Sequence, residues 1–118
     1  MSKPKDCIPV SEAKTLQANW MSTREVYIKN AMGSEDTCAV TFNIDQLQEF
    51  IDYVKVESKK QGFNNPGIRV YFAAYDNAVS KKATVFLNAT EDDGGNSKNN
   101  YKIDALNKGQ NGWPPRAY

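Results

Sequence analysis

The chain has 118 residues, of which 40% are hydrophobic and 25% are charged, as in an ordinary globular protein. Its 15 basic and 14 acidic side chains leave a net charge of +1 and are interleaved along the chain, so nucleic acid is not an expected partner. No apolar run is long enough to span a membrane, and none follows the first residues as in a signal peptide, so no membrane association is expected.

The side-chain inventory argues against most enzyme chemistry. The chain has no histidine, which removes the Ser–His and Cys–His pairs of nucleophilic catalysis. Two cysteines without a histidine cannot form a standard structural zinc site. Cys7 and Cys38 could form a disulfide in an oxidising compartment, but two free thiols in a reducing cytoplasm are the preferred interpretation. We therefore expect a cytoplasmic protein without a cofactor, with a mature secreted form as the alternative.

The N-terminal part predicts an arm followed by a helix. Residues 1–9 contain two prolines and three charges and are expected to be disordered, whereas residues 10–118 are expected to form a single domain. Ser11 is a suitable N-cap for a first helix that reaches at least Met21. Two continuations are open: the helix runs on to a glycine stop at Gly33, or Val26 to Ile28 form a short strand.

The central part predicts a short strand over 37–42 and then a second helix over 44–61, capped by Asn43. Helix 44–61 carries a wide apolar stripe, as expected for packing on a sheet. The stripe consists of Ile44, Leu47, Phe50, Ile51 and Val54.

Two clearly alternating strands are predicted over 68–75 and 83–90, and a third short strand over 101–106. The first two are joined too closely for a crossover helix, so they should pair antiparallel. The predicted fold is α+β, with two main helices packed on a small antiparallel sheet of three to four strands. The stripe of helix 44–61 is expected to cover the apolar side of the sheet, formed by Ile68, Val70, Val85 and Leu87.

The other side of the predicted sheet is unusually aromatic. Its side chains are Arg69, Tyr71, Tyr75 and Phe86, residue types that are enriched at binding hot spots. The alternative is that the protein's own first helix or its Trp113 tail covers this face. Trp113 itself begins a Trp-Pro-Pro-Arg segment that fits either a polyproline ligand or a tail pinned to its own domain.

The acidic loop over 91–97 is a second candidate site. Asp92 and Asp93 follow Glu91, and their carboxylates could hold a calcium ion or serve a metal-dependent hydrolase. The loop lacks the spacing of an EF-hand, and a solvated turn between strands explains the same residues without a ligand.

Four short strings taken together resemble a group of small proteins of Bacteroidetes bacteria to which no activity has been assigned. The strings are Val10-Ser11-Glu12-Ala13, Gly67-Ile68-Arg69-Val70-Tyr71-Phe72, Ala83-Thr84-Val85-Phe86-Leu87 and Gly112-Trp113-Pro114-Pro115. The resemblance spans residues 8 to 118 and implies a bacterial origin and the same order of elements. The cysteines that often accompany the Pro-Pro ending in that group are absent.

The sequence therefore predicts a non-enzymatic binding or interaction module that acts on an unknown protein partner or by self-association. The proposed contacts are Arg69, Tyr71, Tyr75, Phe86 and Trp113. The alternative is a protein that binds a small ligand or a metal, possibly a hydrolase, through the loop at 91–97.

Overall fold

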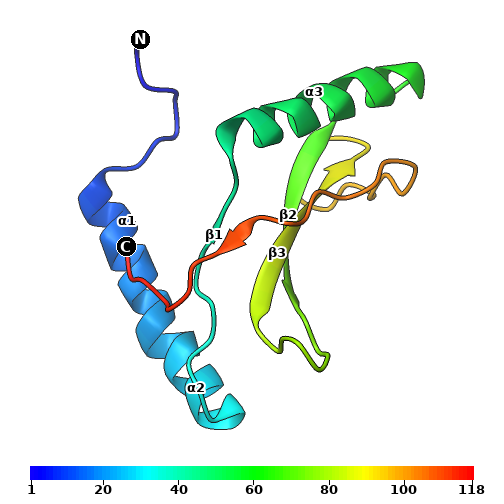
Figure 1. Cartoon of the computed structure of the whole chain (residues 1–118). Coiled ribbons are helices and arrows are strands. Elements are labelled where there is room, and N and C mark those ends of the chain that lie inside the picture. The colour runs from blue at the N-terminus through cyan, green and yellow to red at the C-terminus, as the bar shows by residue number, and fades with distance from the viewer. The chain divides into compact units, whose positions relative to one another are not determined.

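A computed structural model describes all residues from 1 to 118 and shows two compact units (Figure 1). One unit consists of Met1–Ala39 together with Gly112–Tyr118, and the other of Val40–Asn111. The expected single domain over 10–118 stays a prediction, since two compact units can belong to one folding domain.

The first unit is built on one interrupted helix. Helix α1 (Val10–Trp20) passes through a π-helical segment, η1 (Met21–Glu25), into helix α2 (Val26–Met32). The helix stops at Gly33, whose φ of 78° lies in the left-handed region that glycine adopts without strain. The continuation to Gly33 is therefore confirmed, and the alternative strand over 26–28 is not formed.

The start of α1 differs from the expectation by two residues, since its N-cap is Pro9 and not Ser11. The backbone carbonyl of Pro9 accepts from the N–H of Ala13 at 3.0 Å, so the helix begins at Val10. Ser11 lies inside the first turn and does not cap it.

The second unit begins with a short strand and the long helix. Strand β1 (Val40–Thr41) pairs antiparallel with β4 (Gln110–Asn111), so only part of the predicted strand over 37–42 is formed. Helix α3 (Ile44–Lys60) follows. The side chain of Asn43 accepts from the N–H of Gln46 at 3.1 Å, which confirms Asn43 as its N-cap.

Strands β2 (Gly67–Ala74) and β3 (Ala83–Thr90) form a regular antiparallel hairpin of eight residues each. The predicted third strand over 101–106 is not formed, because its residues turn beside β3 and meet it only at an isolated bridge between Leu87 and Leu106. The α+β class is confirmed, but the expected sheet of three to four strands is replaced by two separate two-stranded sheets, β1–β4 and β2–β3.

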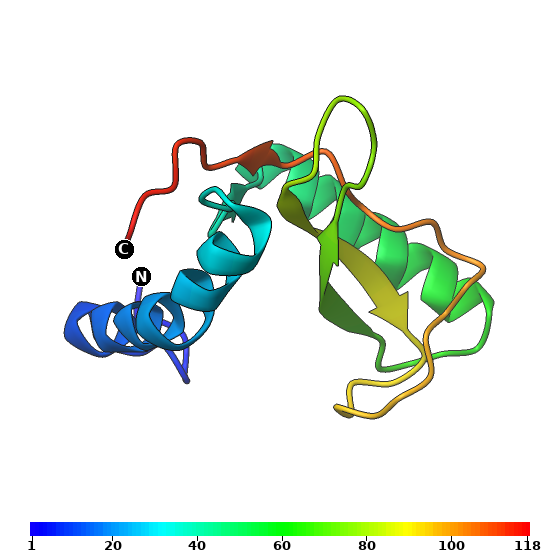
Figure 2. The ribbon, with the colours of Figure 1, turned by 90° about the horizontal axis from the view of Figure 1, so that it is seen from below.

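The core of this unit lies between α3 and one face of the hairpin (Figures 1 and 2). Its buried side chains are Phe50, Val54, Leu87, Ala89 and Ile103, against which Phe42, Leu47 and Leu106 pack. Leu47, Phe50 and Val54 of the predicted stripe join this core as expected, whereas Ile44, at the start of α3, is 81% exposed and does not. The predicted contact of α3 with Ile68 and Val70 is wrong, because the core gathers on β3 and both β2 side chains stay exposed.

Two valines on α3 test this placement of the core. Val54 is 2% exposed and Val56 is 54% exposed. We expect Val54→Ala to lower the free energy of unfolding by about 1.5–3 kcal/mol, because it removes two buried methyl groups and leaves a cavity. Val56→Ala should change it by less than about 0.5 kcal/mol. Urea titrations followed by circular dichroism would measure both, and equal losses would contradict the described core.

Candidate interaction surface

The pairing of β2 with β3 sorts the side chains of the hairpin onto two faces. Partners across an antiparallel pair share a face, and successive residues alternate between the faces. The apolar face carries Ile68 beside Ala89, Val70 beside Leu87 and Phe72 beside Val85. The polar aromatic face carries Arg69 beside Asn88, Tyr71 beside Phe86 and Ala73 beside Thr84.

On the polar aromatic face, the predicted site residues are half-buried and make contacts within the protein. The rings of Tyr71 and Phe86 stack with centroids 5.2 Å apart and planes inclined by 27°. Tyr75 lies just beyond β2, and its hydroxyl donates to the side-chain oxygen of Asn107 at 2.9 Å. The amide of Asn107 in turn donates to the carbonyl of Val85 at 3.0 Å. Most of the polar groups on this face are therefore already engaged within the protein.

Asn99 is the centre of the hydrogen-bond network on this face. Its side-chain oxygen accepts from Arg69 Nη1 at 2.7 Å and from Asn88 Nδ2 at 2.9 Å. Its amide donates to the hydroxyls of Tyr71 at 2.9 Å and Tyr101 at 3.2 Å. The sequence analysis missed Asn99, because an asparagine in a polar loop is typical of a turn and carries no sign of the strand to which the loop returns.

The network changes the acidity of one tyrosine. The hydrogen bond from Asn99 and then the Arg69 guanidinium lower the pKa of Tyr71 below its ordinary value of 10.0. Both act by stabilising the phenolate, which accepts hydrogen bonds and carries the charge opposite to that of arginine.

Trp113 is the fifth predicted contact residue. It belongs to the segment Gly112–Tyr118 of the other unit, where it is half-exposed. Its proposed role in binding stays a prediction.

The apolar face is covered over β3 but open over β2. Leu87 and Ala89 are buried, whereas Ile68 is 38%, Val70 53% and Phe72 92% exposed. These three β2 side chains form a row on the core-facing side of the sheet, which we call the β2 apolar row. The row is the largest departure from the expected packing, and it puts a fully exposed aromatic ring on a regular strand.

The backbone beside the β2 apolar row is also free. The N–H of Tyr75 donates to the carbonyl of Lys82 at 3.0 Å, so odd-numbered residues of β2 turn their polar groups toward β3. The N–H and C=O groups of Ile68, Val70, Phe72 and Ala74 therefore point away from β3, and none of them has a backbone partner. We call this side of the strand the free edge of β2.

The corresponding edge of β3 is occupied. Leu87 and Leu106 exchange backbone hydrogen bonds of 2.9 and 2.8 Å, and the N–H of Asn100 donates to the carbonyl of Ala89 at 2.9 Å. The segment that returns from the hairpin toward β4, orange in Figure 1, supplies these bonds. The sheet is thus closed on one edge and open on the other.

The acidic loop is arranged as a turn. Asp92 accepts through Oδ1 from the N–H of Asp93 at 2.9 Å and from the Asn65 amide at 3.4 Å, and the N–H of Glu91 donates to the carbonyl of Lys98 at 2.9 Å. No cluster of three or more His, Cys, Asp or Glu side chains suitable for a metal ion is present. Asp92 and Asp93 are exposed.

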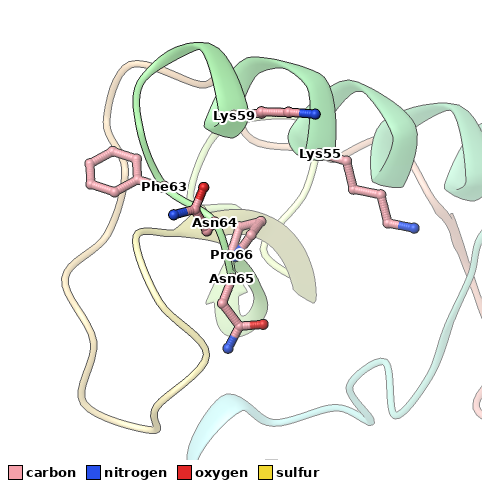
Figure 3. A pocket seen from close by; sticks show the side chains of 6 residues that line it. All are labelled: Lys55, Lys59, Phe63, Asn64, Asn65 and Pro66. Carbon is pink, nitrogen blue, oxygen red and sulfur yellow. The ribbon is translucent and has the colours of Figure 1, made fainter.

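A hollow of about 440 Å³ lies where α3 ends (Figure 3). It is lined by Lys55, Lys59, Phe63, Asn64, Asn65 and Pro66. In Figure 3 the two lysine side chains extend away from the Phe63 ring, so their charges do not converge on one point. The hollow therefore offers less for recognition than the free edge of β2.

None of the helices has both the length and the apolar composition needed to cross a membrane. Comparisons of the chain with protein-family models, curated proteins and solved structures gave no match.

Removing the centre of the network should have measurable effects. We expect Asn99→Ala to lower the free energy of unfolding by about 1–2 kcal/mol, since it breaks several partly exposed hydrogen bonds at once. Asn96→Ala is the matched control, because Asn96 is an exposed asparagine in the same loop. Denaturant titration would measure the free energy of unfolding of both variants. Equal losses of free energy would contradict the described network.

The lowered pKa of Tyr71 gives a second test of the network. Absorbance at 295 nm should show one tyrosine that ionises at lower pH than an ordinary tyrosine. Tyr71→Phe should remove this part of the absorbance change. Because the folded state favours the phenolate, the stability of the wild type relative to Tyr71→Phe should rise as the pH rises from the lowered pKa to 10. A difference in stability that stays constant over that range would contradict the assignment.

Proposed function

We propose that this protein is a non-enzymatic interaction module that binds another protein chain through the free edge and the apolar row of β2. The observation that carries the proposal is that exposed apolar side chains and unpaired backbone groups occur together on one strand, β2. All three residues of the β2 apolar row, Ile68, Val70 and Phe72, also carry backbone groups without a partner.

An extended chain that adds to a sheet edge would contact both the unpaired backbone groups and the apolar side chains of β2. Its backbone completes the ladder of hydrogen bonds, and its alternate side chains pack beside those of the edge strand. Burying the β2 apolar row against such a chain would contribute about 25 cal/mol for each Å² of apolar surface removed from water.

The absence of protective features on β2 supports the same function. Edge strands that must stay single are usually short, bulged or interrupted by lysine or proline. Strand β2 is eight residues long, pairs with β3 without a bulge, and contains neither lysine nor proline. Its only charged residue, Arg69, lies on the opposite face and is bonded to Asn99 and the Gly95 carbonyl.

This proposal moves the main binding surface from the polar aromatic face to the apolar one. Tyr71 and Phe86 remain candidate contacts, because they lie at the middle of the same hairpin and stay partly exposed. Ligand or metal binding by the loop at 91–97 remains the alternative, but it has less support, since Asp92 already serves the turn. A bacterial, cytoplasmic setting is part of the proposal, and the free thiols of Cys7 and Cys38 are compatible with it.

Photo-cross-linking in the organism that makes the protein would test the proposed surface. Phe72, 92% exposed on β2, would be replaced by p-benzoylphenylalanine, with Val79, 96% exposed in the β2–β3 connection, as the matched control position. We expect a protein adduct from position 72 that Ile68→Lys in the same chain abolishes. No adduct, or an equal adduct from position 79, would refute the proposed surface.

A further inference from the structure

We propose that the chain which occupies the free edge of β2 is a second copy of this protein, paired antiparallel through its own β2 around a twofold axis at Tyr71. This inference rests on the proposed function and names its partner. It predicts a dimer with a continuous four-stranded sheet in the order β3–β2–β2–β3.

The backbone of β2 is complementary to itself in this register. An axis at Tyr71 places Ile68 opposite Ala74 of the second copy, and Val70 opposite Phe72 of the second copy. All four of these residues turn their N–H and C=O groups outward, so each such pair can exchange two backbone hydrogen bonds. Every outward-pointing polar group of the strand from Ile68 to Ala74 is then paired.

The side chains are complementary in the same register. On the apolar face, Val70 meets Phe72 of the second copy twice, once on each side of the axis, and aromatic rings pair favourably with β-branched residues across strands. On the polar aromatic face, the two copies of Tyr71 meet at the axis as a non-hydrogen-bonded pair, in which opposed side chains approach most closely. Both rows of one strand thus find suitable partners in the identical strand.

The single charge of the strand is compatible with self-pairing. Arg69 faces Ala73 of the second copy in this register, and the two arginines are displaced from each other by four residues. At about 3.3 Å per residue the displacement is about 13 Å. That exceeds the screening length of about 8 Å at physiological ionic strength, so the like charges oppose pairing only weakly.

The occupied edge of β3 explains why the assembly would stop at two copies. Leu106 and Asn100 already bond to the outer edge of β3, so the four-stranded sheet ends on both sides in a covered edge. A twofold contact that uses the same surface on both chains is closed and cannot propagate. The two α3 helices would lie on the same side of the joined sheet, since both cover the apolar face.

The mass of the purified protein tests dimer formation. Sedimentation equilibrium should give twice the chain mass of 13.2 kDa. Val70→Lys should weaken the dimer about tenfold or more, because it places a charge in the apolar row beside Phe72. Val79→Lys adds the same charge to an exposed valine outside the strand and should leave the mass unchanged. Circular dichroism would establish that both variants are folded.

Disulfide trapping tests the register. In a Cys7→Ser, Cys38→Ser background, Tyr71→Cys should form a covalent dimer under mild oxidation, because the two positions face each other at the axis. Ile68→Cys should not, since its two copies would be displaced by six residues, about 20 Å along the strand. Equal trapping at both positions, or none at Tyr71→Cys, would overturn the register.

The outcomes separate this inference from the proposed function. A wild type that stays monomeric at every concentration, or a Val70→Lys variant as dimeric as the wild type, overturns pairing with a second copy. If the adduct from position 72 in cells then has a mass other than that of two chains, the proposed interaction surface stands and its partner is a different protein. If position 72 gives no adduct, both proposals fall.

Discussion

The antiparallel register of β2 and β3 organises the Val40–Asn111 unit. By placing Val70 beside Leu87 and Tyr71 beside Phe86, it separates an apolar face from a polar aromatic one. A shift of one residue in either strand would exchange the faces of that strand. The core beneath α3 and the hydrogen-bond network on the other side therefore follow from the same set of backbone bonds.

The two strands of this hairpin have very different surroundings. Strand β3 is covered by α3 through Phe50 and Val54 and is bonded along its outer edge by the returning segment through Leu106 and Asn100. Strand β2 forms its backbone ladder with β3 alone, and beyond β3 its side chains Arg69 and Tyr71 bond to Asn99. Because a single two-stranded hairpin is marginally stable in water, α3 and the returning segment supply much of what holds it. Both lie on the β3 side of the hairpin, so the outer edge of β2 has no backbone partner.

Several polar side chains of the hairpin are already hydrogen-bonded within the protein. Arg69 and Tyr71, which could otherwise act on a substrate, are bound to Asn99, and Tyr75 is bound to Asn107. These bonds fix the positions of the side chains and use several of their donors and acceptors. What remains open on β2 is apolar surface and regular backbone, the two components from which strand addition takes its free energy.

The amino-acid sequence was sufficient to predict the local elements, because their signals are local. The stripe and the Asn43 cap predicted α3, Gly33 marked the end of α2, and strict alternation located β2 and β3 within one residue. It also placed Arg69, Tyr71 and Phe86 on one face, since alternation along a strand is independent of what lies beyond it.

Which part of the apolar face is covered depends on the packing of α3. Val70 and Leu87 are both hydrophobic and lie opposite each other in the hairpin. Val70 is exposed and Leu87 is buried, because α3 packs on the β3 side. Residues 101–106 likewise turn beside β3 without forming a strand, and Asn99 reaches Arg69 and Tyr71, through contacts between segments far apart in the chain. These outcomes depend on where distant segments meet, and hydrophobic periodicity carries no information about that.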